Sequence, residues 1–439
     1  MNLASKLELP IIGSLPKQWT IAPLGELLEG GTRNGIYKSK EFHGRGAKIV
    51  NMGELFGNSR LGDIPMKRVE LTNDELTKSS LKKGDLLFAR RSLTAEGAGK
   101  CSIIRNVGEP TVFESSIIRA RPNIQKVVPE FLYYVFQSSY RKYILDTIKR
   151  TVAVSGITGA DLVTLQIPIP PIRTQRTIAD KLTEIDDKIE LNKKTNETLE
   201  SMAKAIFKEW FIDFGPVKAK AEGKKPFGMD DKTASLFPDT FEDSELGQIP
   251  KGWKVKSLGD ACDIIMGQSP PGDTYNENGN GMVFYQGRAE FGSRYPSPRL
   301  FCSEPSRIVK RGTVLLSVRA PVGDLNISTE TQTCIGRGLA GILHKIGGTT
   351  FTYYLLQSLK DKFDMYNGEG TVFGSINKDT LSAIKVVSPP ESVVTNFLNL
   401  VQPLDDLDLS NFEESRSLTH TRDLLLPKLI SGEISLNDV

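Results

Sequence analysis

Two stretches of the chain combine basic side chains with amide side chains, which are the groups that could bind a polyanion. Lysine and arginine neutralise phosphates, whereas arginine, asparagine and glutamine present paired hydrogen-bonding groups that fit base edges in a DNA groove. The candidates in the first stretch are Arg33, Asn34, Lys38, Lys40, Arg45, Arg90 and Arg91. The candidates in the second are Gln268, Gln286, Arg288, Arg294, Tyr295 and Arg319. For each single residue the alternative is an ordinary surface loop, so the hypothesis depends on the clusters.

The distribution of charge favours the same hypothesis. Residues 1–150 contain 24 lysines and arginines against 15 acidic residues, and residues 246–388 contain 16 against 12. Residues 389–439 contain 3 against 9, so the small formal net charge of +3 hides two basic blocks and one acidic block. A polyanionic partner for the basic blocks is the natural hypothesis, and solvated surface charge is the alternative.

Patterns that would indicate catalysis or metal binding are missing. Four separated cysteines and three scattered histidines predict free thiols in a reducing cytosol and no metal centre. The stretch Gly336–Gly341 matches G-x-G-x-x-G, but a strand-like run follows it where a dinucleotide site needs a helix. The carboxylate pairs Asp186-Asp187 and Asp405-Asp406 fall on predicted helices, where we expect them to be solvated. The sequence therefore predicts a binding protein with no cofactor or metal of its own.

The elements that would position these residues occur twice. A repeat of this kind predicts one scaffold used twice, with loops free to read different targets. The matching segments are Leu15–Trp19 with Ile249–Trp253, Lys83–Phe88 with Arg311–Leu316, Tyr133–Ser138 with Tyr353–Ser358, and Pro170-Pro171 with Pro389-Pro390.

A long helix is predicted after each double proline. The first, over Gln175–Trp210, would span roughly 54 Å and contains neither proline nor glycine. Its apolar seam, with two asparagines expected to set the register, is Ile178, Leu182, Ile185, Ile189, Asn192, Asn196 and Leu199. The second seam is weaker and includes Phe397, Leu400, Leu404, Leu407 and Asn411.

The second helix contains Pro403, which predicts a kink or a late start because proline removes a backbone hydrogen bond. Neither seam can bury itself alone, so we expect the two helices to pack together. The alternative is that each helix packs on its own domain. The aromatic residues Phe207, Trp210, Phe211 and Phe214 could dock a partner or cap the coil against the second domain, and the second interpretation is favoured.

The predicted fold class is α+β, with two similar, strand-rich domains separated by two long antiparallel helices in a pseudo-two-fold arrangement. Short strands are expected around Lys48–Val50, Leu86–Phe88 and Val314–Val318, and helices over Pro129–Lys142 and Phe351–Lys362. The expected divisions are 1–170 (first domain), 171–214 (central helical region), 215–245 (linker), 246–388 (second domain) and 389–439 (C-terminal helical region). No secretory signal or membrane span is expected, which predicts a cytoplasmic location.

Over nearly its whole length the chain resembles the specificity subunit of type I restriction–modification systems. The segments that carry the resemblance are Ile185–Asn192, Phe207–Phe214, Leu246–Trp253 and Leu424–Ile434. The resemblance implies two target recognition domains, each reading one half of a split, asymmetric DNA site, with the helices as a spacer. Pro403 and the sparsely basic second helical region (Arg416, Arg422 and Lys428) depart from the pattern of the first copy.

The resemblance also implies partners. The subunit would have no activity of its own and would hold two adenine methyltransferase subunits and, for cleavage, translocase–nuclease subunits. S-adenosylmethionine would bind to the methyltransferases, and ATP with Mg²⁺ to the motor subunits. Two alternatives remain open at this point: a self-contained DNA methyltransferase or nuclease, and a tandem scaffold that binds no DNA.

Overall fold

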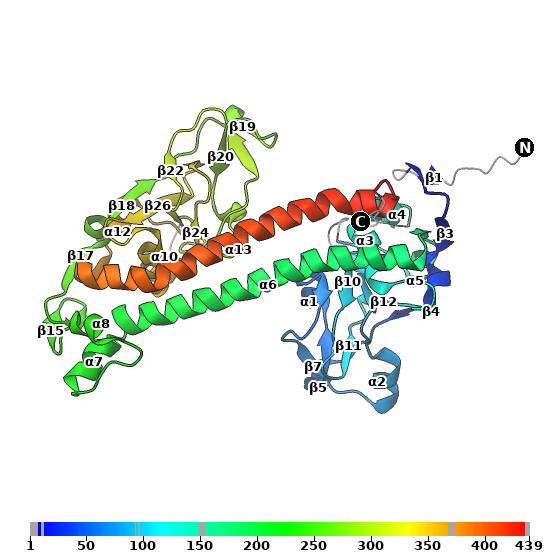
Figure 1. Cartoon of the computed structure of the whole chain (residues 1–439), viewed down its shortest axis with the longest axis horizontal. Helices are drawn as coiled ribbons and strands as arrows, with labels where there is room; N and C mark the ends of the chain where they lie inside the picture. The colour runs from blue at the N-terminus through cyan, green and yellow to red at the C-terminus, as the bar shows by residue number, and fades with distance from the viewer. Residues whose placement is uncertain are drawn as a thin grey trace, which may run out of the picture. The chain divides into compact units, whose positions relative to one another are not determined.

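A computed structural model describes residues 8–9, 13–92, 94, 97–148, 155–367 and 374–434. The chain forms two compact units, one made of 1–192 with 413–439 and the other of 193–412. The boundary falls inside two long helices, α6 (Ile172–Phe211) and α13 (Glu391–Ser431) (Figure 1). Each unit therefore contains one strand-rich domain and one segment of each long helix. No described helix is both long enough and apolar enough to cross a bilayer.

The domain of the first unit is built on a five-stranded sheet. Its strand β8 is buried on both faces, because Leu86 and Phe88 pack into one core cluster and Leu87 and Ala89 into another. The sheet order is β4 (Leu28–Asn34), β12 (Ile117–Pro122), β8 (Leu86–Ala89), β10 (Cys101–Ile104), β6 (Arg60–Leu61). A three-stranded sheet has the order β11 (Thr111–Phe113), β5 (His43–Val50), β7 (Lys67–Val69). Two-stranded pairs are β14 (Gln166–Ile169) with β3 (Thr20–Pro23), β13 (Ser155–Gly156) with β9 (Arg91–Ser92), and β1 (Glu8–Leu9) with β2 (Gly13–Ser14).

The domain of the second unit repeats this plan. Its four-stranded sheet has the order β18 (Cys262–Met266), β26 (Leu339–His344), β23 (Val314–Ser317), β24 (Leu325–Ile327). A five-stranded sheet has the order β19 (Tyr275–Asn276), β21 (Leu300–Cys302), β20 (Met282–Tyr285), β25 (Gln332–Ile335), β22 (Ile308–Lys310). Two-stranded pairs are β17 (Lys254–Ser257) with β27 (Lys385–Ser388), and β15 (Phe241–Ser244) with β16 (Gly247–Pro250).

Short helices complete both domains. In the first unit they are α1 (Met52–Gly57), α2 (Asn73–Ser79), α3 (Pro129–Gln137), α4 (Tyr140–Asp146) and α5 (Gly159–Leu162). In the second they are α7 (Gly215–Ala221), α8 (Asp231–Ser235), α9 (Leu258–Ala261), α10 (Gly348–Ser358), α11 (Lys360–Asp364) and α12 (Lys378–Ala383). The predicted α+β class is confirmed, and each predicted helix after the sheet is split in two, as α3 with α4 and α10 with α11.

The two copies share backbone contacts as well as sequence. The Leu24 amide donates to the Leu165 carbonyl at 2.8 Å, and the Leu258 amide donates to the Ile384 carbonyl at 2.7 Å. Both contacts tie the start of a domain to the segment just before its long helix. The repeat that the sequence predicted is therefore a repeat of structure.

The long helices begin where the double prolines end. Helix α6 has 40 residues and contains the whole predicted range. Helix α13 runs without interruption for 41 residues from Glu391, so the late start predicted from Pro403 is wrong. Its first turns bury Val393, Phe397 and Val401 in the core of the second unit. We attribute the continuity to this packing, which offsets the one hydrogen bond that proline removes.

Within each unit the two helix segments lie side by side and antiparallel. In the first unit Asn192 Nδ2 donates to Glu414 Oε2 at 2.8 Å, and Arg422 Nη1 donates to Asp186 Oδ1 at 2.8 Å. Residue numbers rise along one helix as they fall along the other. In the second unit Asn411 Nδ2 donates to Asn196 Oδ1 at 2.9 Å. The predicted packing of helix against helix is confirmed within each unit.

The seam residues of α6 are buried to different degrees. Ile178 and Leu182 are buried in the same core cluster as Leu426, Leu429 and Ile430 of α13. The predicted seam positions of intermediate exposure are Ile185, Ile189, Asn196, Leu199, Leu404 and Asn411, while Asn192 and Phe397 are buried.

The seam predicted along α13 is partly wrong. Leu400 and Leu407 are exposed, with 49% and 47% of their surface accessible. The positions that turn inward instead are Val401, Asp405 and Asp408. The seam was predicted from the spacing of apolar residues alone. The buried face of α13 also includes two carboxylates, so it lies at a different angle around the helix.

The segment 215–245, expected to be a linker, contains α7, α8 and β15. Val217 and Phe237 from this segment are buried in the core cluster of the second unit. Phe207, Trp210 and Phe211 of α6 join the same cluster, where Phe211 packs against Trp253 with ring centroids 6.0 Å apart. The interpretation that these aromatic residues cap the coil against the second domain is confirmed.

Candidate nucleic-acid interface

The candidate residues of the first unit lie on surface strands and loops. Arg33 and Asn34 are exposed at the end of the edge strand β4, while Lys40 is exposed just before β5 and Arg45 is exposed within β5. Arg91 is exposed in β9, whereas Arg90 is half-buried. The candidates of the first unit are therefore accessible to a ligand, except that Lys38 is half-buried like Arg90.

Several of these basic groups already have partners. Arg33 Nη1 donates to the Lys78 carbonyl at 2.6 Å, at the C-terminal end of α2. Lys38 Nζ lies 2.8 Å from Glu75 Oε1, and Arg45 forms an ion pair with Glu70. A DNA phosphate would have to compete with these contacts. The exposure of a basic side chain is therefore not sufficient to identify it as a phosphate-binding residue.

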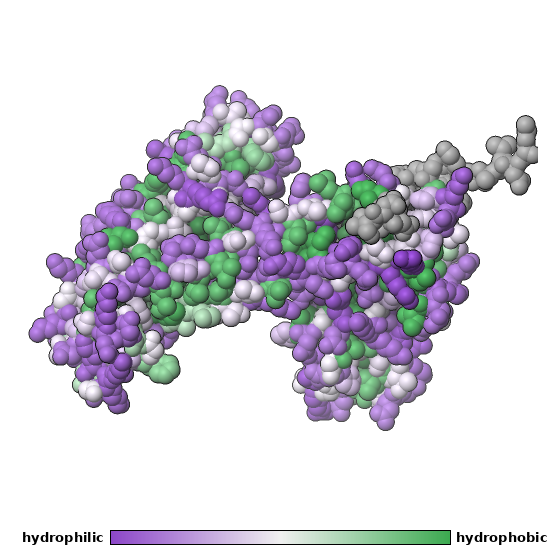
Figure 2. Space-filling view, viewed as in Figure 1, coloured by the Kyte–Doolittle hydropathy of each residue, from purple (hydrophilic) through white to green (hydrophobic). Residues whose placement is uncertain are grey.

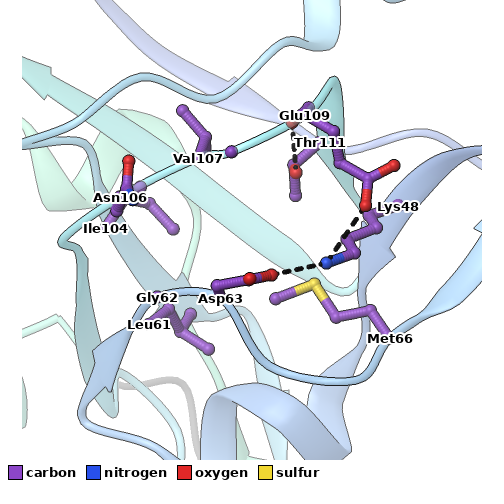
Figure 3. A pocket seen from close by; sticks show the side chains of 11 residues that line it. Lys48, Leu61, Gly62, Asp63, Met66, Ile104, Asn106, Val107, Glu109 and Thr111 are labelled. Carbon is purple, nitrogen blue, oxygen red and sulfur yellow. Dashed lines mark hydrogen bonds and ion pairs between the residues drawn. The ribbon is translucent and has the colours of Figure 1, made fainter.

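In a small pocket beside β5, a lysine of this domain forms ion pairs with two carboxylates. Figure 3 shows Lys48 between Asp63 and Glu109, with Nζ 2.8 Å and 3.2 Å from their respective oxygens. Side-chain hydrogen bonds from Arg68 and then Lys48 lower the pKa of Glu109. The pocket volume of about 10 Å³ holds at most one water molecule, so we assign it no ligand.

In the second unit, three candidates lie on the surface near the ends of strands. Gln268 follows β18, and Gln286 and Arg288 follow β20, and all three are exposed. Arg288 forms an ion pair with Asp324. These exposed glutamine and arginine side chains are of the types that contact base edges in DNA.

The structure contradicts two of the predicted contacts. Arg294 and Tyr295 are 3% and 5% exposed, so neither can reach a DNA duplex in this conformation. Arg294 Nη2 lies 2.7 Å from Asp405 Oδ1, and Tyr295 packs on Phe412 with ring centroids 4.7 Å apart. Both residues anchor the loop between β20 and β21 to α13, and we withdraw them as candidate DNA contacts.

The surroundings of Arg294 keep it charged. Burial alone would lower the pKa of Arg294, but Asp405, Tyr354, Tyr295 and Asp408 outweigh burial and raise this pKa. Burial is also the main cause that raises the pKa of Asp408.

The prediction that both aspartate pairs are solvated is half wrong. Asp186 and Asp405 are 8% and 7% exposed. Tyr134 Oη donates to Asp186 at 2.8 Å, and Tyr354 Oη donates to Asp405 at 2.8 Å. Their occurrence at matching places in the repeat was the signal that could have revealed this shared role.

The neighbouring Asp187 has a different role. It is exposed and forms ion pairs with Arg60 and Arg105, which belong to the domain of the first unit. Sequence reasoning missed both arginines. Together with the Tyr134–Asp186 contact, these pairs fasten the domain to α6.

Arg91 and Arg319 occupy matching places in the two units. Arg91 pairs with Gly156 between β9 and β13, and Arg319 forms an antiparallel bridge with Ser375. Both arginines are exposed. The correspondence that the repeat predicted for these two residues is therefore present in the backbone pairing.

The visible surface of both domains is mainly hydrophilic, with smaller apolar patches between the polar residues (Figure 2). Among the described residues, no group of three or more His, Cys, Asp or Glu side chains is placed to hold a metal ion. The four cysteines Cys101, Cys262, Cys302 and Cys334 are buried free thiols.

Comparison with known proteins identifies the family. The model of the type I restriction modification DNA specificity domain matches residues 16–201 and 250–414, which covers most of the chain and both copies of the repeat. The chain belongs to this family. The resemblance predicted from the sequence is thereby confirmed, and the match to two separate segments agrees with the two structural repeats.

Relatives of similar length are type I specificity subunits. The chain is 33% identical over 430 residues to the putative MjaX specificity subunit of Methanocaldococcus jannaschii, covering 96% of this chain and 95% of that relative. It is 27% identical to the HindI specificity subunit of Haemophilus influenzae, covering 88% and 94% of the two chains. The crystal structure of a type I S subunit from M. genitalium matches with a TM-score of 0.55 and 16% identity, covering 94% of this chain and 96% of that one. At this identity the structure supports the specificity-subunit fold alone.

Proposed function

We propose that this specificity subunit reads a bipartite, asymmetric DNA site, with each domain reading one half. The observation that carries the proposal is the structural repeat. The two domains share their sheet core and their attachment to a long helix. They differ in the exposed side chains of the loops, such as Arg33 and Asn34 in one unit and Gln268 and Gln286 in the other. A shared scaffold with different loops provides two different readers.

We further propose that the helices α6 and α13 hold the enzymes that act on the site. Two methyltransferase subunits would dock on this repeated scaffold, because a repeated surface offers the same docking place twice. Translocase–nuclease subunits would join for cleavage. In this proposal S-adenosylmethionine binds to the methyltransferases, and ATP with Mg²⁺ binds to the motor subunits, with no cofactor on this chain.

Exchange of one domain tests the two-reader proposal. Residues 15–150 would be replaced by the corresponding domain of another family member, and the complex would be expressed with its methyltransferase subunits. Mapping methylated adenines across the host genome should show a new sequence in one half of the site and the old sequence in the other half. A change in both halves would contradict the proposal.

Purified chain provides the second test. Incubated with DNA and S-adenosylmethionine, it should transfer no methyl groups until methyltransferase subunits are added. Transfer by the chain alone would favour the alternative of a self-contained methyltransferase. Retention on a DNA column should fall as salt rises, because phosphate contacts release counterions. Absence of salt-dependent retention would favour a scaffold that does not bind DNA.

A further inference from the structure

Arg91 and Arg319 occupy the same backbone position in the two units. The Arg90 amide donates to the Ser116 carbonyl at 2.8 Å, and the Val318 amide donates to the Gly338 carbonyl at 2.9 Å. These donors immediately precede Arg91 and Arg319 along the chain. Each donor directly follows a central strand, β8 or β23, and each acceptor directly precedes the neighbouring strand, β12 or β26.

The segment on the other side also matches. The Ile157 amide donates to the Arg90 carbonyl at 3.0 Å, and the Ile376 amide donates to the Val318 carbonyl at 3.0 Å. Each arginine is thus held between a central sheet strand and the segment that leads into α5 or α12. Three backbone contacts in each unit define the position, so the correspondence does not depend on sequence alignment alone.

The side chains of these arginines are accessible for binding. Both residues are exposed, and no described carboxylate lies within 4.0 Å of either guanidinium group. Arg45 and Arg288, by contrast, are paired with Glu70 and Asp324. An arginine without an acidic neighbour can bind an anionic ligand without first breaking an ion pair.

The correspondence limits what such a residue can contact. If the two domains read different bases, the same side chain at the same place should meet a feature that both half-sites share. Every duplex presents a sugar–phosphate backbone at constant spacing, whereas base edges change with sequence. A guanidinium group binds a phosphate through two parallel hydrogen bonds.

We infer that Arg91 and Arg319 are equivalent phosphate-binding residues, one for each half-site, which set the register of each domain on the duplex without selecting bases. This inference rests on the proposed function. It assigns base reading to residues that differ between the units, such as Gln286.

The test measures salt dependence and sequence discrimination separately. Full-length chain in complex with its methyltransferase subunits would be titrated with a duplex that carries the mapped site. Arg91→Gln and Arg319→Gln should each reduce the slope of log affinity against log salt by about 0.9 in magnitude, and the double variant by about twice that. The affinity ratio between the mapped site and sites with one changed base should stay at the wild-type value.

Matched variants separate this role from general effects of charge and folding. Arg91→Lys and Arg319→Lys keep the charge and should keep the wild-type slope. Lys232→Gln removes one positive charge at an exposed position in α8, outside both long helices, and should leave the slope unchanged. Gln286→Ala should change discrimination in one half-site while the slope stays constant.

Two results would overturn the inference. One is an unchanged slope in both glutamine variants, and the other is loss of discrimination at one base position with the slope preserved. A wild-type complex that shows no sequence preference would contradict the proposed function itself, and the inference with it. A wild-type complex that discriminates normally, beside variants that behave like it, would contradict the inference alone.

Discussion

Arg294 Nη2 lies 2.7 Å from Asp405 Oδ1, and the two side chains are 4% and 8% exposed. Three tyrosine rings surround the guanidinium group, the nearest being Tyr353 with its centroid at 4.6 Å. Arg294 belongs to the loop between β20 and β21, and Asp405 belongs to α13. A buried ion pair therefore fastens the loop that carries Arg288 to a long helix within the second unit.

Removing one member of this pair should destabilise the second unit strongly. Arg294→Met leaves Asp405 buried without its counter-charge, which costs about 3–5 kcal/mol. The double variant Arg294→Met with Asp405→Leu should recover part of this loss, because Asp405 no longer carries an unpaired charge, whereas the buried Asp408, 3.7 Å from Arg294 Nη1, still lacks its counter-charge. Hydrogen exchange of α10 and β26 measures the effect, with β12 of the first unit as an internal control. A double variant less stable than the single one would contradict this account.

The two buried tyrosine–aspartate contacts provide a matched pair of variants. Tyr134→Phe and Tyr354→Phe each remove one hydroxyl that donates to a buried carboxylate, which should cost about 1.5–3 kcal/mol. We expect similar losses, each confined to its own unit, because Asp186 keeps Arg422 and Asp405 keeps Arg294. Hydrogen exchange resolved by unit measures both effects. If either substitution destabilises both units equally, the contacts are not local.

The seam asparagines should fix the register of α6 against α13 and lower the stability of the helix pair. Asn411 donates to Asn196, which in turn donates to the Asp408 carbonyl at 2.8 Å. Asn411→Leu alone should lower the melting temperature, because it leaves the Asn196 oxygen without this donor at a loss of about 1 kcal/mol. Replacing both asparagines with leucine should raise the melting temperature, since polar seam residues reduce stability. A decrease in the double variant would show that these residues stabilise the coil itself.

The second unit should weaken in mild acid because of His344. Burial lowers the pKa of this histidine to about 4, and its Nδ1 accepts the Gly347 amide at 2.8 Å, a bond that requires unprotonated Nδ1. Between pH 6.5 and about 4 the unfolded chain binds a proton that the folded chain does not, so stability falls as pH falls through this window. The loss is at most about 3 kcal/mol.

His344→Gln should flatten this dependence, because glutamine keeps polar atoms and does not titrate. Urea unfolding between pH 7 and pH 4.5, followed by the tryptophan fluorescence of the second unit, which includes Trp253, measures how the free energy of unfolding changes with pH. At the corresponding place of the first unit, opposite Leu28, stands Pro122, so that unit provides a reference without the histidine. An unchanged pH profile in the variant would assign the acid sensitivity to other groups.

The sequence predicted the elements whose evidence is local. The double prolines marked the starts of α6 and α13 within a few residues, because proline prevents the preceding residue from continuing a helix. The apolar runs at Leu86–Phe88 and Val314–Val318 predicted short strands, which the structure contains as β8 and β23. The duplication predicted equivalent structures, since similar local sequences bury similar faces.

The errors concern residues whose partners are distant in the chain. Arg294 and Tyr295 have the composition of an exposed DNA-binding loop, and nothing within twenty residues reveals Asp405 or Phe412. Leu400 and Leu407 fit a heptad, yet α13 turns Val401 and Asp405 inward because the inner face is set by its neighbours. The periodicity of one helix reports its own faces and does not identify what will cover them.

The sequence by itself determined that this protein consists of two related domains, each joined to a long helix, and that it belongs with the type I specificity subunits. Only the tertiary structure decided which charges bind to one another and which remain available. A buried ion pair forms only where folding removes both groups from water and brings them within reach. That condition separates Arg294, which holds a loop to a helix, from Arg319, which is exposed at a position that both domains share.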